Sequence, residues 1–166
     1  SLPHVQADLR DPTAARLARA FGAPMLLHRP SREATLRRTA ERLGHTGLTF
    51  EGGETGRFDD GVLASGTAGV LRVLTALGMS ETPPPPPPHP SVESVETQWV
   101  RARRSGILRL TAGLGARVRR GDVLGAIGDT RATSEMPVKA HVDGVVLTVA
   151  ARPVVHQGDA IVQIAI

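Results

Sequence analysis

Glu51 is the side chain whose surroundings in the sequence best suit acid–base chemistry. It closes a short apolar run, Leu48 to Glu51, that reads as a strand, and Gly52 and Gly53 follow it. A carboxylate at the end of a strand and before two glycines can project into a cleft with little backbone crowding. Glutamate is one of the side chains that transfer protons in general acid–base catalysis. From spacing alone, however, an ordinary glutamate at a strand end is the favoured interpretation.

The histidines do not form a recognisable metal site. Zinc centres use His, Cys, Asp and Glu at close, regular spacing, but these histidines are scattered and the chain has no cysteine. No histidine is followed three residues later by glutamate. His156 precedes Asp159 at that distance, but Gly158-Asp159 is one of two repeated turns, so we expect no metal ligand there. The six histidines are His4, His28, His45, His89, His141 and His156.

Composition argues against several other functions. The 166 residues include no cysteine, which rules out disulfides and thiol chemistry, and contain no phosphate-binding glycine loop or nucleophile-elbow motif. No apolar run approaches the ~20 residues of a membrane span, so we expect no membrane partner and a cytoplasmic location. The net charge is +4, but the arginines are mixed with acidic residues and only 2% of residues are aromatic. We therefore expect no nucleic-acid partner.

Six consecutive prolines, Pro83 to Pro88, divide the chain into two unlike pieces. Proline lacks a backbone N–H and favours polyproline II, so this stretch is expected to be a semi-rigid spacer rather than a helix or central strand. We predict an α/β piece over residues 1–80, a proline-rich linker over 81–94 and a β module over 95–166.

The first piece alternates strand and helix signals. Caps and stops predict helices from Asp11-Pro12 to Gly22, from Ser31 to about Leu43, and from Asp59 or Asp60 to Gly78. Short strands are expected at 24–28 and 48–51. The stripe shared along one face of the third helix contains Leu63, Thr67, Val70, Leu71, Leu74 and Leu77. This order predicts an α/β layer with a largely parallel sheet, too thin to be more than the distal part of a larger domain.

The second piece contains an internal repeat of short Val/Ile/Leu runs and Gly-Asp turns. Gly106 precedes the Gly121-Asp122 turn by fifteen residues, and Gly144 precedes the Gly158-Asp159 turn by fourteen. Two such units can bury each other's apolar face, which predicts a compact all-β module. Over roughly Val100 to Ile166 the doubled pattern resembles the barrel-sandwich hybrid of biotinyl and lipoyl carrier domains.

This module lacks the modified lysine of a carrier. The hairpin tip between the two halves is expected near Asp129–Thr133, which contains no lysine, and Lys139 lies in the following strand. Arginine cannot replace lysine at the tip, because its guanidinium stays protonated and is a poor nucleophile. We therefore predict a structural or gating appendage, since fold alone does not imply function.

The first piece carries several short strings in a familiar order. They are Leu2-Pro3-His4-Val5-Gln6-Ala7-Asp8-Leu9, Leu36-Arg37, Gly44, Leu48-Thr49-Phe50-Glu51-Gly52-Gly53, Gly69-Val70, Leu74, and Leu77-Gly78-Met79. Together with the attached β module, they resemble the C-terminal part of the succinylglutamate desuccinylase/aspartoacylase family, whose catalytic domain is similar in fold to zinc carboxypeptidases.

That resemblance implies a zinc-dependent deacylase acting on an N-acyl amide, or a related ester, of a small molecule such as an N-acyl amino acid. It implies that Glu51 is the catalytic glutamate and Arg37 a substrate-carboxylate ligand, while His4 is structural. The family's zinc ligands, an H-x-x-E pair and a later His, lie upstream of the matching segment. We therefore expect zinc in the full-length enzyme, no activity from this chain alone, and a homo-oligomer. The solvated face of a helix is the alternative explanation for Arg37 and its neighbours Arg38 and Arg42.

A second hypothesis is a non-catalytic interaction or oligomerisation module. The presence of H-x-x-E in the encoding reading frame would favour the enzyme, and its absence would favour the module. A weaker hypothesis is nucleic-acid binding through the arginine clusters at 101–104 and 117–120, which predicts steep salt dependence.

Overall fold

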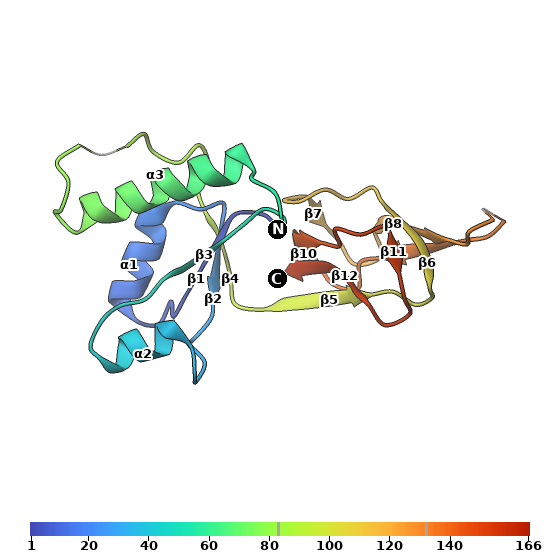
Figure 1. Cartoon of the computed structure of the whole chain (residues 1–166), viewed down its shortest axis with the longest axis horizontal. Helices are drawn as coiled ribbons and strands as arrows, with labels where there is room; N and C mark the ends of the chain where they lie inside the picture. Colours follow the sequence, from blue (N-terminus) through green and yellow to red (C-terminus); the bar gives the residue numbers. More distant parts are fainter. Residues whose placement is uncertain (83, 132) are drawn as a thin grey trace. The chain divides into compact units, whose positions relative to one another are not determined.

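A computed structural model describes residues 1–82, 84–131 and 133–166 as two compact units (Figure 1). The α/β unit runs from Pro3 to Val95, and the β unit contains Glu96 to Ile166 together with Ser1 and Leu2. The described residues form a mixed α/β structure with three sheets, which confirms the mixed α/β class expected from the sequence. No helix of the described segments has the length and apolar character needed to cross a membrane.

The α/β unit is built on a four-stranded sheet in the order β3-β1-β2-β4. Strands β1 (His4–Ala7), β2 (Met25–His28) and β4 (Val92–Ser94) are parallel, and β3 (Thr49–Glu51) is antiparallel to β1. The largely parallel sheet agrees with the sequence. Strand β4 lies within the predicted linker 81–94, so the linker's last residues are part of the sheet.

Helix α1 (Pro12–Phe21) follows the sequence signals closely. Asp11 caps it by accepting hydrogen bonds from the backbone of Thr13 and Ala14, and Gly22 ends it with a left-handed φ of 72°. Its apolar face lies in the unit's core. The buried core residues are Val5, Ala7, Ala14, Ala18, Phe21, Ala23 and Leu26.

Helix α2 (Leu36–Arg42) is shorter than predicted. Its N-cap is Thr35, whose hydroxyl accepts a hydrogen bond from the Arg38 N–H at 3.2 Å. Ser31 is therefore not the cap; its hydroxyl donates to the carboxylate of Glu41, a residue in the helix. The chain before Thr35 contains Ala34 at a positive φ of 61°, a conformation that a helix cannot include.

Helix α3 (Asp60–Ala76) begins after the Asp59 cap as predicted, but its packing face is different. The helix meets the core at glycines: a Cβ on Gly69 would lie 2.2 Å from the Phe21 ring, and one on Gly66 would lie 2.9 Å from the Phe50 ring. The two rings touch, with centroids 5.1 Å apart. The glycines let α3 approach where a larger side chain would hold it away. Much of the predicted stripe is exposed: Leu63, Val70, Leu71 and Leu77 are each at least 42% exposed.

The proline run is attached to the α/β unit. Arg72 of α3 donates to the carbonyls of both Pro85 and Phe21, and Gly22 leaves room for Pro87, which a Cβ would meet at 2.9 Å. The chain then enters β4, where Val92 N–H bonds the Pro24 carbonyl. The described prolines therefore contact the α/β unit, which the semi-rigid spacer expected from composition did not include. Pro83 lies outside the described residues.

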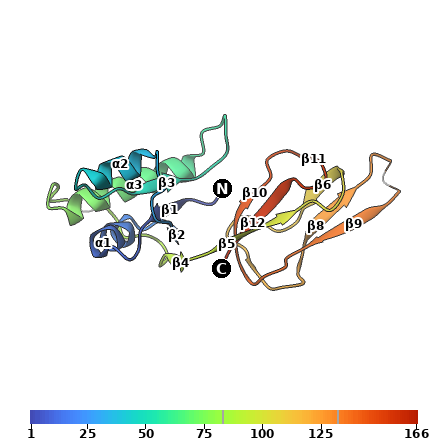
Figure 2. The ribbon, with the colours of Figure 1, turned by 90° about the horizontal axis from the view of Figure 1, so that it is seen from below.

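The β unit consists of two four-stranded antiparallel sheets (Figure 2). One has the order β5-β12-β10-β7, and the other has the order β11-β6-β8-β9; the described strands do not close into a barrel. The strands of the first sheet are β5 (Thr97–Arg101), β7 (Arg117–Val118), β10 (Gly144–Val149) and β12 (Ala160–Ala165). Those of the second are β6 (Gly106–Leu110), β8 (Val123–Gly128), β9 (Glu135–Lys139) and β11 (Val154–Val155).

The internal repeat is visible as an exchange of short strands. Strand β7 of the first half pairs with β10 of the second, while β11 of the second half pairs with β6 of the first. Gly106 and Gly144 open equivalent strands, and a Cβ on either would lie within 2.2 Å of a carbonyl oxygen on a neighbouring strand. The two halves share one core, and the hairpin between them, from β8 to β9, has the position predicted for a carrier tip. Lys139 ends β9, and Ala132 at the tip lies outside the described residues.

Candidate active site

Glu51 ends strand β3 at one edge of the α/β sheet, as the sequence predicts. Its side chain is 53% exposed. A Cβ on Gly52 would lie 2.9 Å from Val62 and 3.2 Å from the Pro3 backbone, and Gly53 has a left-handed φ of 75°. Both positions are therefore suited to glycine, because the chain passes close to α3 and then turns. Because the chain turns at Gly53, Glu51 is the last residue of β3.

His4 lies directly opposite Glu51 on the neighbouring strand. The two residues are register partners in the β1–β3 pair, and His4 Nε2 is 3.5 Å from Glu51 Oε2. Gln6 Nε2, two residues along β1 on the same face, is 3.4 Å from His4 Nε2. His4 is buried, with 4% of its side chain exposed, so the imidazole is held where it meets the carboxylate. The three side chains form a short polar row across β1 and β3.

Phe50 connects this row to the hydrophobic core. Its side chain alternates with that of Glu51, so it points to the opposite face of the sheet, where it packs on Phe21 and fits against Gly66. Val5 on β1 faces the same core. Helix α3 therefore positions β3 through Phe50, and β3 in turn fixes where the Glu51 carboxylate lies.

Arg37, the other predicted site residue, makes a structural contact. Its Nη2 donates to the Arg29 carbonyl at 2.5 Å, and its aliphatic stem covers Gly47, where a Cβ would meet Arg37 Cγ at 2.6 Å. Its Nη1 is buried and has no hydrogen-bond partner among the described residues. Arg37 thus ties α2 to the segment that follows β2.

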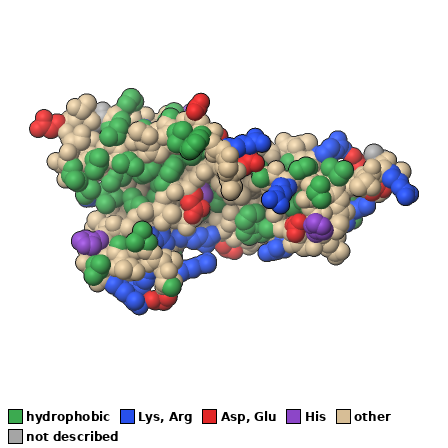
Figure 3. All heavy atoms as spheres, in the orientation of Figure 1, with side chains coloured by type: hydrophobic (Ala, Val, Ile, Leu, Met, Phe, Trp, Pro, Cys, Tyr) green, Lys and Arg blue, Asp and Glu red, His purple; other side chains and the backbone are tan. Residues whose placement is uncertain are grey.

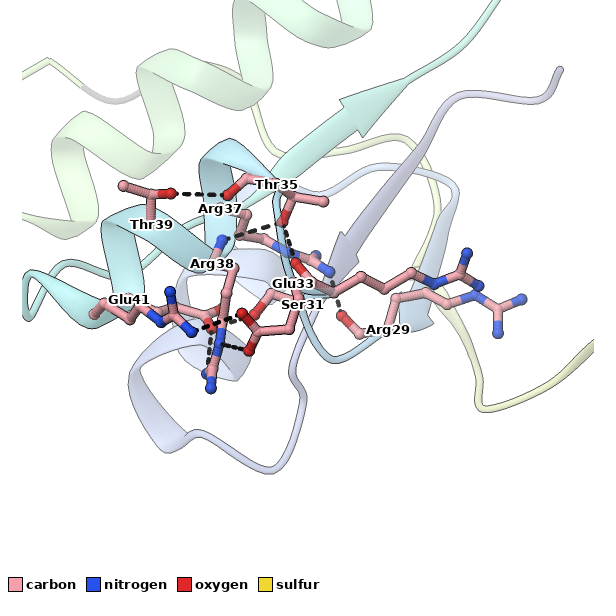
Figure 4. Close-up of polar contacts among 10 residues, drawn as sticks. Arg29, Ser31, Glu33, Thr35, Arg37, Arg38, Thr39 and Glu41 are labelled. Atoms are coloured by element: carbon pink, nitrogen blue, oxygen red, sulfur yellow. Dashed lines mark hydrogen bonds and ion pairs between the residues drawn. The ribbon is translucent and has the colours of Figure 1, made fainter.

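The other charged residues of α2 form an exposed ion-pair network (Figure 4). Arg38 and Arg42 both reach Glu33, at 3.0 and 2.6 Å, and Arg38 lies 3.6 Å from Glu41. These pairs correspond to the solvated helix face that we considered as the alternative for these arginines. Exposed pairs of this kind contribute little individually.

Glu51 and Arg37 lie toward opposite ends of β1. Glu51 pairs with His4 at the start of the strand, whereas Arg29, which receives the Arg37 guanidinium, bonds through its N–H to the Ala7 carbonyl at the strand's end. The structure brings His4 and Glu51 together and does not bring Arg37 to them. The sequence predicts a structural role for His4, whereas the structure brings it to Glu51. The available signal is the alternation of His4 with Val5, which puts His4 and Gln6 on one face of β1.

The described residues do not form a metal centre. No group of three or more His, Cys, Asp or Glu side chains lies close enough together to hold an ion in the part of the chain that the structure covers. The His4–Glu51 pair offers two donors, fewer than the three protein ligands of a catalytic zinc site. A zinc site therefore does not fit these residues by themselves.

The sequence of the α/β unit matches a known family. Residues 1–77 match the model of the succinylglutamate desuccinylase/aspartoacylase catalytic domain. These residues belong to that family. The match contains Glu51, His4 and Arg37 and all of α1, α2 and α3.

Solved structures of the family extend the likeness to nearly the whole chain. A succinylglutamate desuccinylase/aspartoacylase from Rhodobacter sphaeroides is 27% identical, with a TM-score of 0.82 over 99% of this chain and 53% of that chain. The ectoine utilization protein EutE (DoeB) from Ruegeria pomeroyi shares the fold at 20% identity, with a TM-score of 0.83 over 99% and 55%. An aspartoacylase family protein from Mesorhizobium loti does so at 19% identity, with a TM-score of 0.73 over 99% and 58%.

This chain therefore spans about half the length of these solved relatives. Among curated protein sequences, none matches it significantly.

Proposed function

We propose that this chain is the C-terminal part of a zinc-dependent deacylase that hydrolyses an N-acyl amide, or a related ester, of a small molecule such as an N-acyl amino acid. The observation that carries the proposal is the position of the Glu51 carboxylate. It lies at the end of β3, is half-exposed, and is next to the buried His4. Both residues belong to the segment that matches the family's catalytic domain. The described residues hold no group of three metal-ligating side chains. In this proposal the zinc ligands lie upstream of the matching segment, as the family resemblance implies.

In this proposal Glu51 moves protons. Its carboxylate accepts a proton from the water that attacks the acyl carbonyl, and it then gives that proton to the departing amine as the C–N bond breaks. The products are a carboxylate and a free amine. His4, 3.5 Å away and buried, would hold the carboxylate in one orientation, which keeps it within reach of both the water and the amine. Arg37 remains a predicted substrate ligand whose observed contacts are structural.

The exposed apolar surface of the α/β unit supports a larger catalytic domain. Hydrophobic side chains gather over α3 (Figure 3), and they include the exposed Leu63, Val70 and Leu71. Monomeric proteins rarely leave a contiguous apolar patch of this kind facing water. The patch suits packing against further elements of the same domain, because the solved relatives are about twice as long.

For the β unit we propose a barrel-sandwich-hybrid-like appendage without a carrier function. Two observations support this: the halves interlock by exchanging β7 and β11, and the only lysine lies in β9 rather than at the hairpin tip. In the whole enzyme such a unit would stabilise or gate the catalytic domain. The competing hypothesis of an interaction or oligomerisation module is tested by the same experiment as the enzyme.

The first test compares the intact mass of the purified protein with its reading frame. We expect the frame to continue upstream and to encode H-x-x-E and a later His. In that full-length protein, Glu51→Gln should abolish release of amine from N-succinylglutamate and N-acetylaspartate while leaving the circular dichroism spectrum unchanged. The matched control is Glu54→Gln, three residues further on, whose nearest cation is Arg57 at 3.9 Å. It should retain turnover.

Two results would contradict the proposal. A folded and active Glu51→Gln enzyme would remove Glu51 from catalysis. A reading frame without H-x-x-E would leave the chain without the family's metal site and would favour the interaction module. Turnover by the purified 166-residue chain in proportion to bound zinc would contradict our expectation that the chain is inactive alone.

A further inference from the structure

The structure extends the internal repeat of the β unit by one more motif. Val100-Arg101-Ala102-Arg103 precedes Gly106 by the same spacing with which Val138-Lys139-Ala140-His141 precedes Gly144. Burial follows the repeat: the valine is 6% exposed and the alanine 3% exposed in both copies. The basic residues that alternate with the valine and the alanine point the other way and are exposed: Arg101 and Arg103 in one copy, Lys139 and His141 in the other. Each alanine carbonyl accepts a hydrogen bond from a turn glycine, Ala102 from Gly158 and Ala140 from Gly121.

These two copies line one groove. Its main cavity has a volume of about 540 Å³ and is lined by Arg101, Arg103, Arg120, Lys139 and His141 over a floor of apolar residues. A second cavity of about 480 Å³ shares four of those five residues and adds Trp99, Gln157 and Gly158. The groove therefore extends from the Gly121 turn to the Gly158 turn, and cations project from both copies of the repeat.

Neither of the two cavities has an Asp or Glu among its described lining residues. The β unit's chain from residue 96 onward contains ten Arg and Lys but six Asp and Glu, whereas the remaining chain has ten of each, so the whole net charge of +4 belongs to the β unit. The acidic residues nearest in sequence are engaged in turns: Asp122, Asp143 and Asp159 each accept a backbone N–H. Among the described residues, Arg103, Arg120 and Lys139 have no ion-pair partner.

Strand edges flank the same groove. Val100 and Arg101 belong to β5, and Met136 to Lys139 belong to β9. Each of these strands is the last in its sheet and is paired on one side only. An unpaired edge offers backbone N–H and carbonyl groups to an extended peptide. Nucleic acid suits the groove less well, because Trp99 is the only Phe, Trp or Tyr among the described lining residues, and single strands bind by stacking on several such rings.

We propose that this groove is a docking site for an extended acidic segment of a partner protein. The segment's carboxylates pair with the guanidinium and ammonium groups of the two copies, and its apolar atoms cover the floor between them. The competing explanation is that the charges and Pro137 only protect two strand edges from self-association. That explanation needs no ligand, so a binding measurement separates the two. The proposal does not rest on the deacylase assignment.

Trp99 makes the test direct, because it is the chain's only tryptophan and lies in the groove. The purified 166-residue chain is titrated at low salt with a short peptide of alternating Glu and Thr, while Trp99 fluorescence and calorimetric heat are followed. We expect saturable binding with a change in fluorescence, and no binding of the same peptide with Gln in place of Glu. Raising the salt concentration should weaken binding.

A matched pair of double variants localises the site. Arg103→Gln/Lys139→Gln neutralises one cation from each copy and should weaken binding at least about tenfold. Arg117→Gln/Arg152→Gln removes the same charge from exposed residues outside the groove and should keep the affinity within about twofold. Unchanged Trp99 emission in the free variants confirms that they fold.

Four results would overturn the proposal. They are equal weakening in the two variants, peptide heat without a Trp99 response, no binding at low salt, and tighter binding of citrate or of a single-stranded oligonucleotide than of the acidic peptide. The third result would leave edge protection as the role of these charges.

Discussion

At the scale of single residues, the Arg37 guanidinium has one nitrogen that donates a hydrogen bond, Nη2, and one buried nitrogen, Nη1, that has no partner among the described residues. Arg37→Met keeps the stem over Gly47 and loses only the hydrogen bond to the Arg29 carbonyl, while it also removes the buried, unpartnered Nη1. We therefore expect a loss of about 1 kcal/mol or less in unfolding free energy. Arg37→Ala should cost more, by about 0.8 kcal/mol for each methylene group that no longer covers Gly47. Urea denaturation measures both, and equal losses would show that the guanidinium rather than the stem supplies the stability.

The sequence could place Glu51 but not its partner. A strand end followed by two glycines is visible in one dimension, and the structure has both glycines at positions that need them. The approach of His4 depends on β3 pairing antiparallel to β1, a register set by residues more than forty positions apart. Arg37 shows the converse case. Its place in a motif suggests ligand binding, whereas the fold turns its guanidinium toward a backbone carbonyl.

At the scale of elements, Gly69 controls how closely α3 approaches α1. A Cβ there would lie 2.2 Å from the buried Phe21 ring, so Gly69→Ala forces the ring or the helix to move. The cost of overpacking, about 1–3 kcal/mol, exceeds the gain of about 1 kcal/mol in helix propensity. We expect a lower urea midpoint for the helical signal. In the Gly69→Ala background, Phe21→Leu should cost less than in the wild type; additive effects would contradict this contact.

The carboxylate of Asp129 accepts hydrogen bonds from Arg131, Thr133 and Ser134 in the hairpin from β8 to β9. Hydrogen bonds to its carboxylate lower the pKa of Asp129 from 3.8 to about 2. The Thr133 hydroxyl has the largest effect and the Thr133 N–H the next, followed by Ser134 and Arg131. Because the pKa is lowered in the folded state, the stabilisation is present above about pH 4 and is lost as the pH falls toward 2. The urea midpoint of the wild type should exceed that of Asp129→Asn at pH 5, and the difference should shrink toward pH 2. A constant difference would contradict this.

The elements best predicted from the sequence are those whose ends depend on local hydrogen bonds, such as helix caps. Asp11 with Pro12 and Asp59 cap α1 and α3 as expected. The predicted start of helix α2 was wrong, because the hydroxyl of Thr35, rather than that of Ser31, accepts the hydrogen bond from the Arg38 N–H. The apolar stripe of α3 gave the wrong packing face, since helical spacing cannot show that glycines on another face admit two phenylalanine rings.

At the scale of the whole chain, composition indicated two pieces but not their electrostatic difference. The net charge of +4 belongs to the β unit, and the α/β unit is neutral. The proline run also does not mark the boundary between the two units. The described prolines dock on Arg72 and Gly22, and the α/β unit continues to Val95. Contacts of a linker with a folded unit depend on three-dimensional placement, which composition does not record.

Separate hydrophobic cores predict two unfolding transitions. The β unit's core unites both halves of the repeat and buries Leu124, Ile161 and Ile164 completely, whereas the α/β unit has a smaller core and an exposed apolar face on α3. We therefore expect the α/β unit to unfold at a lower urea concentration. The probes separate naturally, because α1, α2 and α3 all belong to the α/β unit and Trp99, the single tryptophan, belongs to the β unit. Circular dichroism of the helices should change before Trp99 fluorescence. Coincident curves would show one cooperative unit instead.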